Sequence, residues 1–117
     1  MENYITPKQW MLTVVEYGQD HGCIATGRSG CQHHHVVGRK GKQNKVLIGP
    51  WFVLPIWWEL HDVSSNNPNN VTHFRHRFTD LYGKQKLLFA EMVETLQNGG
   101  IEVPEEDILS AISLTNM

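Results

Sequence analysis

Two extended stretches joined by a polar turn set the strongest limit on how this chain can fold. Residues 34–38 include a pair of β-branched valines, and residues 45–54 form a longer apolar run that is interrupted at Gly49-Pro50. The segment between them is polar and contains a glycine, which is typical of a turn between antiparallel strands. We therefore predict a β-hairpin with a wide loop, whose second strand lies at an edge or carries a bulge because of Pro50.

Helical patterns flank this hairpin on both sides. Thr6-Pro7 predicts the start of the first helix, with Gln9 placed to complete a capping box, and the helix is expected to end at Gly18 or Gly22. Further helices are predicted from Pro55 to His61, from Asn70 or Thr72 to Gly83, from Lys84 to Gln97, and from Pro104 to about Leu114. A hairpin surrounded by helices is an α+β fold.

Length and composition limit the number of domains. With 117 residues, of which 40% are hydrophobic and 19% charged, the chain can form one modest core, and we predict a single domain over residues 1–117. No segment approaches the roughly eighteen apolar residues of a membrane-spanning helix. The N-terminal residues lack the pattern of a signal peptide. We therefore expect no membrane partner and a cytoplasmic location.

Histidine is unusually frequent, with seven in the chain. Because successive side chains of a strand point to opposite faces, His34 and His35 can have different roles, one binding a metal ion and the other contacting water or substrate. The predicted fold can bring His34, His61 and His73 from three elements to one cation. From spacing alone, a metal site and a set of solvated histidines are equally acceptable interpretations.

Positive charge is concentrated, although the net charge of the chain is −2. Residues 28–45 contain five of the ten basic residues and no acidic one. Such a segment can bind the phosphates of a polyanion, or it can be a solvated loop. The candidate DNA-binding residues are Arg39, Lys40, Lys42, Arg75 and Arg77.

The cysteines and tryptophans leave several roles open. Cys23 and Cys31 could be half of a structural zinc site, buried apolar residues or reactive thiols. A closed zinc site needs four ligands and the chain has no other cysteine, so burial is favoured. Trp51, Trp57 and Trp58 are either core residues, which we favour, or an exposed patch that binds a host protein.

Several short segments, taken in order, carry a resemblance to a known family. They are Thr6-Pro7, Gly22–Gly27, His34-His35-Val36, Val53–His61, Val71-Thr72-His73 and Tyr82–Leu88. Over roughly residues 6–97 the chain resembles the HNH, or ββα-metal, nuclease superfamily. It is most similar to small phage and prophage proteins related to the phage recombination-enhancement, RecA-dependent nuclease. The resemblance implies an HNH-like, ββα-metal core, a β-hairpin plus a helix, surrounded by additional helices.

The resemblance also implies roles for individual residues. His34 and His35 match the family's paired histidines, of which the first is a metal ligand and the second the catalytic general base that activates water. His61 matches a later metal ligand, and His73 matches a further ligand or a phosphate-contacting residue. The cofactor implied is a divalent metal ion, either Mg, Mn, Ni or Zn, and no small-molecule substrate is expected.

The chain departs from the family pattern at the positions of its structural zinc. Trp57 stands where the family usually has cysteine, and Leu60 where it often has histidine. Ala25-Thr26 stands where a second cysteine often follows the first. We therefore expect the zinc knuckle to be absent or replaced by apolar packing.

Together with this resemblance, these features predict a metal-dependent DNA endonuclease or nickase of phage or prophage origin, which hydrolyses phosphodiester bonds in phage DNA metabolism or recombination. The expected partners are DNA and a recombinase or another host or phage protein, in the cytoplasm of a bacterial host cell. Phosphate contacts predict low sequence specificity and strong salt dependence. Two alternatives stay open: a nucleic-acid-binding or recombination-accessory protein on a nuclease scaffold that no longer cuts, and a phage protein that binds a host protein.

Overall fold

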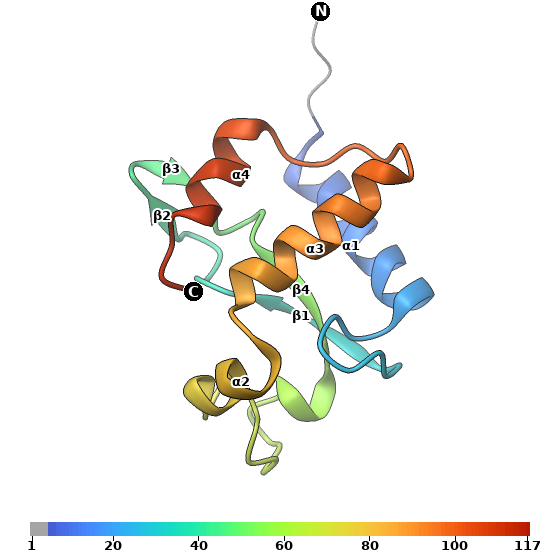
Figure 1. Ribbon diagram of the computed structural model, residues 1–117, viewed down its shortest axis with the longest axis vertical. Coiled ribbons are helices and arrows are strands. Elements are labelled where there is room, and N and C mark those ends of the chain that lie inside the picture. The colour runs from blue at the N-terminus through green and yellow to red at the C-terminus, as the bar shows by residue number, and fades with distance from the viewer. Residues whose placement is uncertain (1–4) are drawn as a thin grey trace, which may run out of the picture.

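The computed structural model describes residues 5–117, which form four helices and two small antiparallel sheets (Figure 1). The elements are α1 (Pro7–His21), β1 (Cys31–His35), β2 (Lys42–Gln43), β3 (Val46–Leu47), β4 (Val53–Trp57), the 3-10 turn η1 (Trp58–Leu60), α2 (Arg75–Tyr82), α3 (Gln85–Asn98) and α4 (Glu106–Ser113). The predicted α+β class is confirmed. No described helix is long and apolar enough to cross a membrane.

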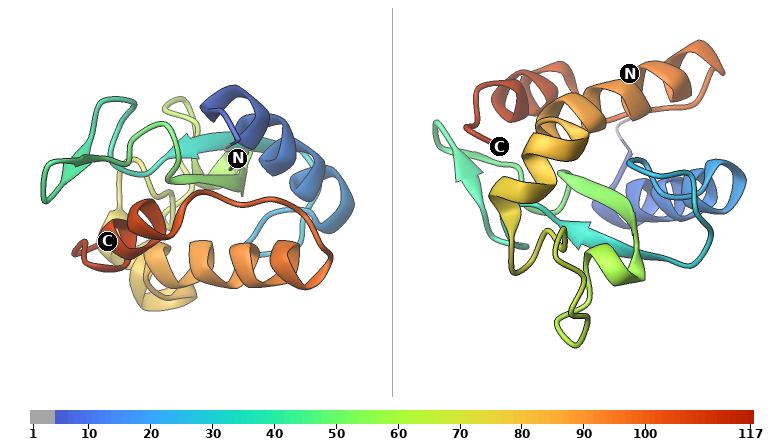
Figure 2. Two further views of the ribbon diagram at one scale, coloured as in Figure 1. Left: turned by 90° about the horizontal axis from the view of Figure 1, so that it is seen from above. Right: turned by 60° about the horizontal axis from the view of Figure 1, so that its bottom comes forward.

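The strands β1 and β4 lie between α1 on one face and α3 on the other (Figure 2). Their antiparallel register pairs His35 with Val53 and His34 with Leu54. Because side chains alternate along a strand, Gln32 and His34 face α3, whereas His33 and His35 face α1. We call these two sides the α3 face and the α1 face.

The beginning of α1 is confirmed as predicted. The Thr6 hydroxyl oxygen accepts a hydrogen bond from the Gln9 amide, and the Gln9 side chain accepts one from the Thr6 amide. The helix continues past Gly18 and ends at Gly22, whose φ is +77°. A Cβ on Gly18 would lie 3.0 Å from the Cβ of Pro55, so this glycine lets α1 pack closely on β4.

The apolar run that was predicted to form one strand is divided in the structure. Its first part forms β3, which folds back on β2, and only its last residues enter β4. Asn44 and Lys45 have φ values of 50° and 67°, the left-handed values that a tight two-residue hairpin turn requires. Gly49 then passes so close to Gly38 that a Cβ on Gly49 would lie 2.3 Å from the Gly38 carbonyl oxygen. This backbone crossing returns the chain to the side of β1, which itself begins and ends earlier than the predicted 34–38 segment.

The prediction of a helix that starts at Pro55 is wrong. Pro55 lies inside β4 opposite His33, and only the single turn η1 follows the strand. Proline is tolerated here because β4 pairs with one neighbour only and so leaves one edge without ladder hydrogen bonds. The chain therefore has a strand pair followed by one short turn where a longer helix was expected.

Asn70 does not cap a helix, contrary to the prediction, and α2 begins later, at Arg75. The Asn70 side chain is fully buried. It makes four hydrogen bonds that connect the loop before α2 to the segment around η1. The amide nitrogen donates to the carbonyls of Glu59 and Asp62, and the amide oxygen accepts from the backbone amides of Thr72 and His73. The predicted limits of α3 and α4 agree closely with the structure.

The core fills the space between α1, the strands and α3. Trp10 and Phe52 both contact Phe89 edge-on, and the Trp10 indole donates to the Trp51 carbonyl. Buried apolar side chains at these positions supply the main stabilisation of the fold. The favoured core interpretation holds for Trp51, which packs against this core, and for Trp57, but is wrong for Trp58, which is 45% exposed.

The cysteines are free thiols rather than a disulfide. Cys23 is buried in the core, as the favoured interpretation predicted, and Cys31 is half-buried beside it at the start of β1. Burial raises the pKa of the Cys31 thiol to about 11, and the neighbouring Cys23 adds to the shift. Cys31 is therefore protonated at neutral pH, which makes it a poor nucleophile.

Replacing Asn70 with alanine is expected to lower the free energy of unfolding by about 3 kcal/mol, because buried carbonyl and amide groups lose their partner. Urea unfolding followed by tryptophan fluorescence measures this loss. Asn66→Ala, at an exposed position of the same loop, is the matched control and should change stability by less than about 0.5 kcal/mol. Equal effects of the two substitutions would contradict the assigned role.

Candidate functional site

Two histidines from separate elements meet on the α3 face. His34 lies in β1 and His61 directly follows η1, and their ring centroids are 4.9 Å apart. The Nε2 atom of His34 lies 2.8 Å from Oε1 of Gln85, the first residue of α3. The structure thus brings together two of the three histidines that were predicted to share a cation.

A chain of hydrogen bonds determines which nitrogen of His61 carries the proton. The Asp62 carboxylate can only accept, so the Gln32 amide nitrogen, 2.7 Å away, must donate to it. The Gln32 oxygen then faces Nδ1 of His61 at 2.7 Å, and this Nδ1 must be the protonated nitrogen. In the neutral ring the lone pair is consequently on Nε2.

The opposite tautomer follows for His34. Its Nε2 donates to the oxygen of the buried Gln85 side chain, which leaves the lone pair on Nδ1. Two neighbouring imidazoles therefore each keep one free nitrogen acceptor. Neutral imidazoles held in this way by outer hydrogen-bond partners are suited to bind a metal ion.

Burial keeps this pair neutral. Burial, with a smaller contribution from the nearby His61, lowers the pKa of His34 to about 4. Burial also lowers the pKa of His61, while the Asp62 carboxylate opposes that shift. Asp62 itself has a pKa lowered to about 2, chiefly because it accepts hydrogen bonds from Gln32 and Ser64. At neutral pH the site is thus two uncharged imidazoles beside an ionised carboxylate.

His35 lies on the opposite face of the same strand. It lines a hollow of about 380 Å³ together with Pro7, Lys8, Met11, Leu12, Arg39 and Pro50. Burial lowers the pKa of His35, and the positive charge of Arg39 lowers it further. His35 is therefore an uncharged proton acceptor at neutral pH.

His73 is held separately from the pair. Its Nε2 lies 2.8 Å from the carbonyl oxygen of Val63, and its side chain is exposed. Across residues 5–117 there is no group of three or more His, Cys, Asp or Glu side chains placed to hold a metal ion. The histidine site consists of the contacting pair His34 and His61, with His35 behind them on the strand.

The five predicted DNA-binding residues are all exposed. Arg39, Lys40 and Lys42 lie on the segment that leads from β1 into β2. On α2, Arg75 donates to the sulfur of Met117, and the Arg77 guanidinium lies 5.2 Å from the centre of the Phe74 ring. The first group is thus adjacent in sequence to His35, whereas the α2 pair already has protein partners.

Three residues of the site were missed by the sequence analysis: Gln32, Asp62 and Gln85. Two of them had a local signal, since Gln32 is two positions before His34 on the same face of a strand and Asp62 adjoins His61. Gln85 had none, because it is 51 positions from its partner His34. Only the packing of α3 on the strands brings them together.

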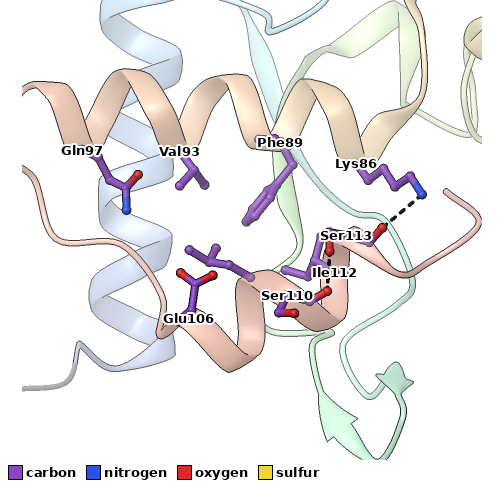
Figure 3. Close-up of a pocket in the computed structure, with 10 residues that line it drawn as sticks. Lys86, Phe89, Val93, Gln97, Glu106, Ser110, Ile112 and Ser113 are labelled. Carbon is purple, nitrogen blue, oxygen red and sulfur yellow. Dashed lines mark hydrogen bonds between the residues drawn. The ribbon is translucent and has the colours of Figure 1, made fainter.

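A second cavity of about 290 Å³ lies between α3 and α4 (Figure 3). Phe89 and Val93 form its apolar side, and Lys86 closes one end by donating to the carbonyls of Ser113 and Thr115. None of the seven histidines lines it. The Lys86 ammonium is used to cap the end of α4, a structural role.

The histidine site combines an edge strand, a contacting imidazole pair and a neighbouring basic segment. Comparisons of the chain with protein-family models, with curated proteins and with solved structures gave no match.

The fold is expected to lose stability as the pH falls from about 6.5 toward 4. In the unfolded chain His34 has an ordinary pKa of about 6.5, whereas in the fold the pKa is about 4. Between these values only the unfolded state binds the proton, so acid favours unfolding. The contribution of His34 to the free energy of unfolding is complete above about pH 6.5, and it amounts to up to about 3 kcal/mol.

Urea unfolding at several pH values between about 7 and 4 checks this prediction. His34→Gln should flatten the dependence, whereas His76→Gln, at an exposed position, should keep it. The lowered pKa values of His33, His35 and His61 act in the same direction. A wild-type stability that does not change over this range would show that His34 is not held neutral by the fold.

Proposed function

We propose that this chain is a metal-dependent DNA endonuclease or nickase with an HNH-like, ββα-metal core. The observation that carries the proposal is the contact of His34 with His61, each with one nitrogen lone pair left free by a glutamine partner. In this interpretation β1 and β4 are the two strands of the core and η1 is a shortened third element.

His34 and His61 are the residues that would hold a divalent cation. When bound, such an ion stabilises the charge on the phosphate and on the leaving oxygen. Gln85 and Gln32 orient the two imidazoles, and Asp62 orients Gln32. His73 is exposed and contacts the carbonyl of Val63, two residues after His61. It would supply either a further ligand or a contact to phosphate.

His35 would take the proton from the attacking water. It is uncharged at neutral pH, and as a half-buried side chain it still has solvent access. β1 is an edge strand with one side unpaired, so a phosphate that lies along this edge can meet His34 on one face and His35 on the other. The strand itself therefore positions the base relative to the metal ligands.

Arg39, Lys40 and Lys42 would bind the phosphates that flank the cut. Such contacts are electrostatic, so binding should weaken steeply with salt and depend little on sequence. Arg75 and Arg77 are secondary candidates because both already contact protein groups. We place this activity in phage DNA metabolism or recombination in a bacterial cytoplasm, with a recombinase as a further candidate partner.

A supercoiled-plasmid assay tests the proposal. The purified protein is incubated with magnesium, manganese, nickel or zinc, and in parallel with EDTA. Nicked or linear plasmid should form with at least one metal, disappear in EDTA and return when that metal is restored in excess. Intact plasmid under all four metals would overturn the proposed activity.

A second candidate is a DNA-binding or recombination-accessory protein that has kept this scaffold without cutting. It is favoured by the packing at two positions where the family has zinc ligands. Leu60 is buried in the core, and the Arg28 guanidinium carbon lies 4.5 Å from the centre of the Trp57 ring. A gel shift on the plasmid samples distinguishes the two. Binding without cleavage under any metal supports this candidate.

A further inference from the structure

The hollow on the α1 face has a mixed lining. Pro7, Met11, Leu12 and Pro50 form apolar walls, and the side chains of Lys8, Arg39 and His35 contribute the polar groups. Its volume of about 380 Å³ is within the usual range of small-molecule sites, roughly 300–1,000 Å³. It is thus large enough for a single organic group and lies beside the candidate general base.

The charge of the lining points to an anionic ligand. Two of the side chains that line the hollow are cationic, and none is acidic. The basic segment that continues from Arg39 through Lys40 and Lys42 extends the same charge away from the hollow. A ligand that combines an apolar body with a negatively charged chain fits this surface, and a strand of nucleic acid has this composition.

The apolar walls show which part of the nucleic acid would enter. Phosphates and sugars gain little from contact with Met11 or Leu12, because their polar groups prefer water or cations. The faces of a nucleobase are apolar and gain from stacking on such walls. In a duplex these faces are already covered by the neighbouring bases, so only an unpaired nucleotide can offer them.

We propose that this hollow binds one unpaired nucleotide next to the phosphate that is cut, with its base against Leu12 and Met11 and its phosphates held by Lys8 and Arg39. The inference rests on the proposed function, since His35 forms one wall of the hollow. The expected substrate is single-stranded DNA or a duplex with a locally unpaired nucleotide. The apolar walls thereby add a preference for strand state that phosphate contacts alone do not supply.

Substitution of Leu12 tests the contact with the base, because this side chain is 57% exposed and its replacement does not open the core. The variant is Leu12→Asn, and the matched control is Leu87→Asn, a leucine on α3 that is 60% exposed and does not line the hollow. Circular dichroism checks that both variants are folded. The probes are a fluorescein-labelled oligothymidylate and a duplex of mixed sequence and equal length, with binding measured by anisotropy in EDTA.

The wild type is expected to bind the single strand more tightly than the duplex. Leu12→Asn should weaken single-strand binding by about tenfold, the loss of roughly one stacking contact, and leave duplex binding unchanged. Leu87→Asn should change neither. Equal loss on both probes, no loss with Leu12→Asn, or no DNA binding by the wild type would overturn the inference.

The binding assay and the plasmid assay can fail independently. Leu12-dependent preference for the single strand without any cleavage would retain the nucleotide site and overturn the nuclease. Metal-dependent cleavage with no effect of Leu12→Asn on the ratio of the two affinities would retain the nuclease and overturn the nucleotide site. Each proposal therefore has its own decisive outcome.

Discussion

Replacing His35 with alanine is expected to lower the rate of DNA cleavage by a factor of about 10²–10⁴, the usual contribution of a general base. The variant removes the only proton acceptor that we assign to the attacking water. It leaves the His34–His61 contact and both glutamine hydrogen bonds in place, because these lie on the other face of β1. Metal affinity should therefore stay at the wild-type level. Single-turnover nicking at saturating metal measures the loss.

The control for this prediction is His76→Ala, which removes an exposed histidine of α2. It should cut at the wild-type rate. The wild-type rate should rise with pH through a pKa below the ordinary value of about 6.5, since burial and Arg39 favour the neutral form of His35. Added imidazole should restore part of the activity of His35→Ala. A rate within about threefold of wild type would rule out His35 as the base.

Replacing His61 with alanine is expected to abolish high-affinity binding of nickel or zinc. His61 is one of the two imidazoles in contact at the site, so the effect should exceed the roughly 10–100-fold loss that is typical of changes to outer hydrogen-bond partners. Isothermal titration without DNA measures it independently of cleavage. Wild-type affinity in His61→Ala would place the metal elsewhere.

Gln32→Leu tests the outer hydrogen bonds of the same site and should lower metal affinity by about 10–100-fold. Leucine keeps the size of the side chain but removes the oxygen that holds Nδ1 of His61 protonated. Gln19→Leu, at an exposed position of α1, is the control and should bind like wild type. His73→Ala should also keep metal affinity if its role is to contact phosphate, and an affinity loss would instead identify a third ligand. An unaltered affinity in Gln32→Leu would show that the tautomer of His61 does not depend on Gln32.

Much of the helical structure could be predicted because its signals are local. The capping box at Thr6 lies within one turn of helix, and the glycine-rich end of α3 follows directly on its last residues. Residue type and order likewise point to His34, His35, His61 and His73 as candidates, of which His73 contacts the Val63 carbonyl instead of the other three. The structure places His34 and His61 in contact, and His35 behind them on the same strand.

The sequence by itself determined the α+β class, the capped start of α1 and the limits of the last two helices, and it marked several histidines as candidates. Tertiary structure decided that Pro55 belongs to a strand, that Asn70 binds loop backbone rather than capping a helix, and that Gln85 reaches His34 across 51 positions. The reason is physical. A cap or a glycine stop is satisfied by hydrogen bonds within a few residues, whereas strand register and buried polar contacts depend on which distant surfaces pack together.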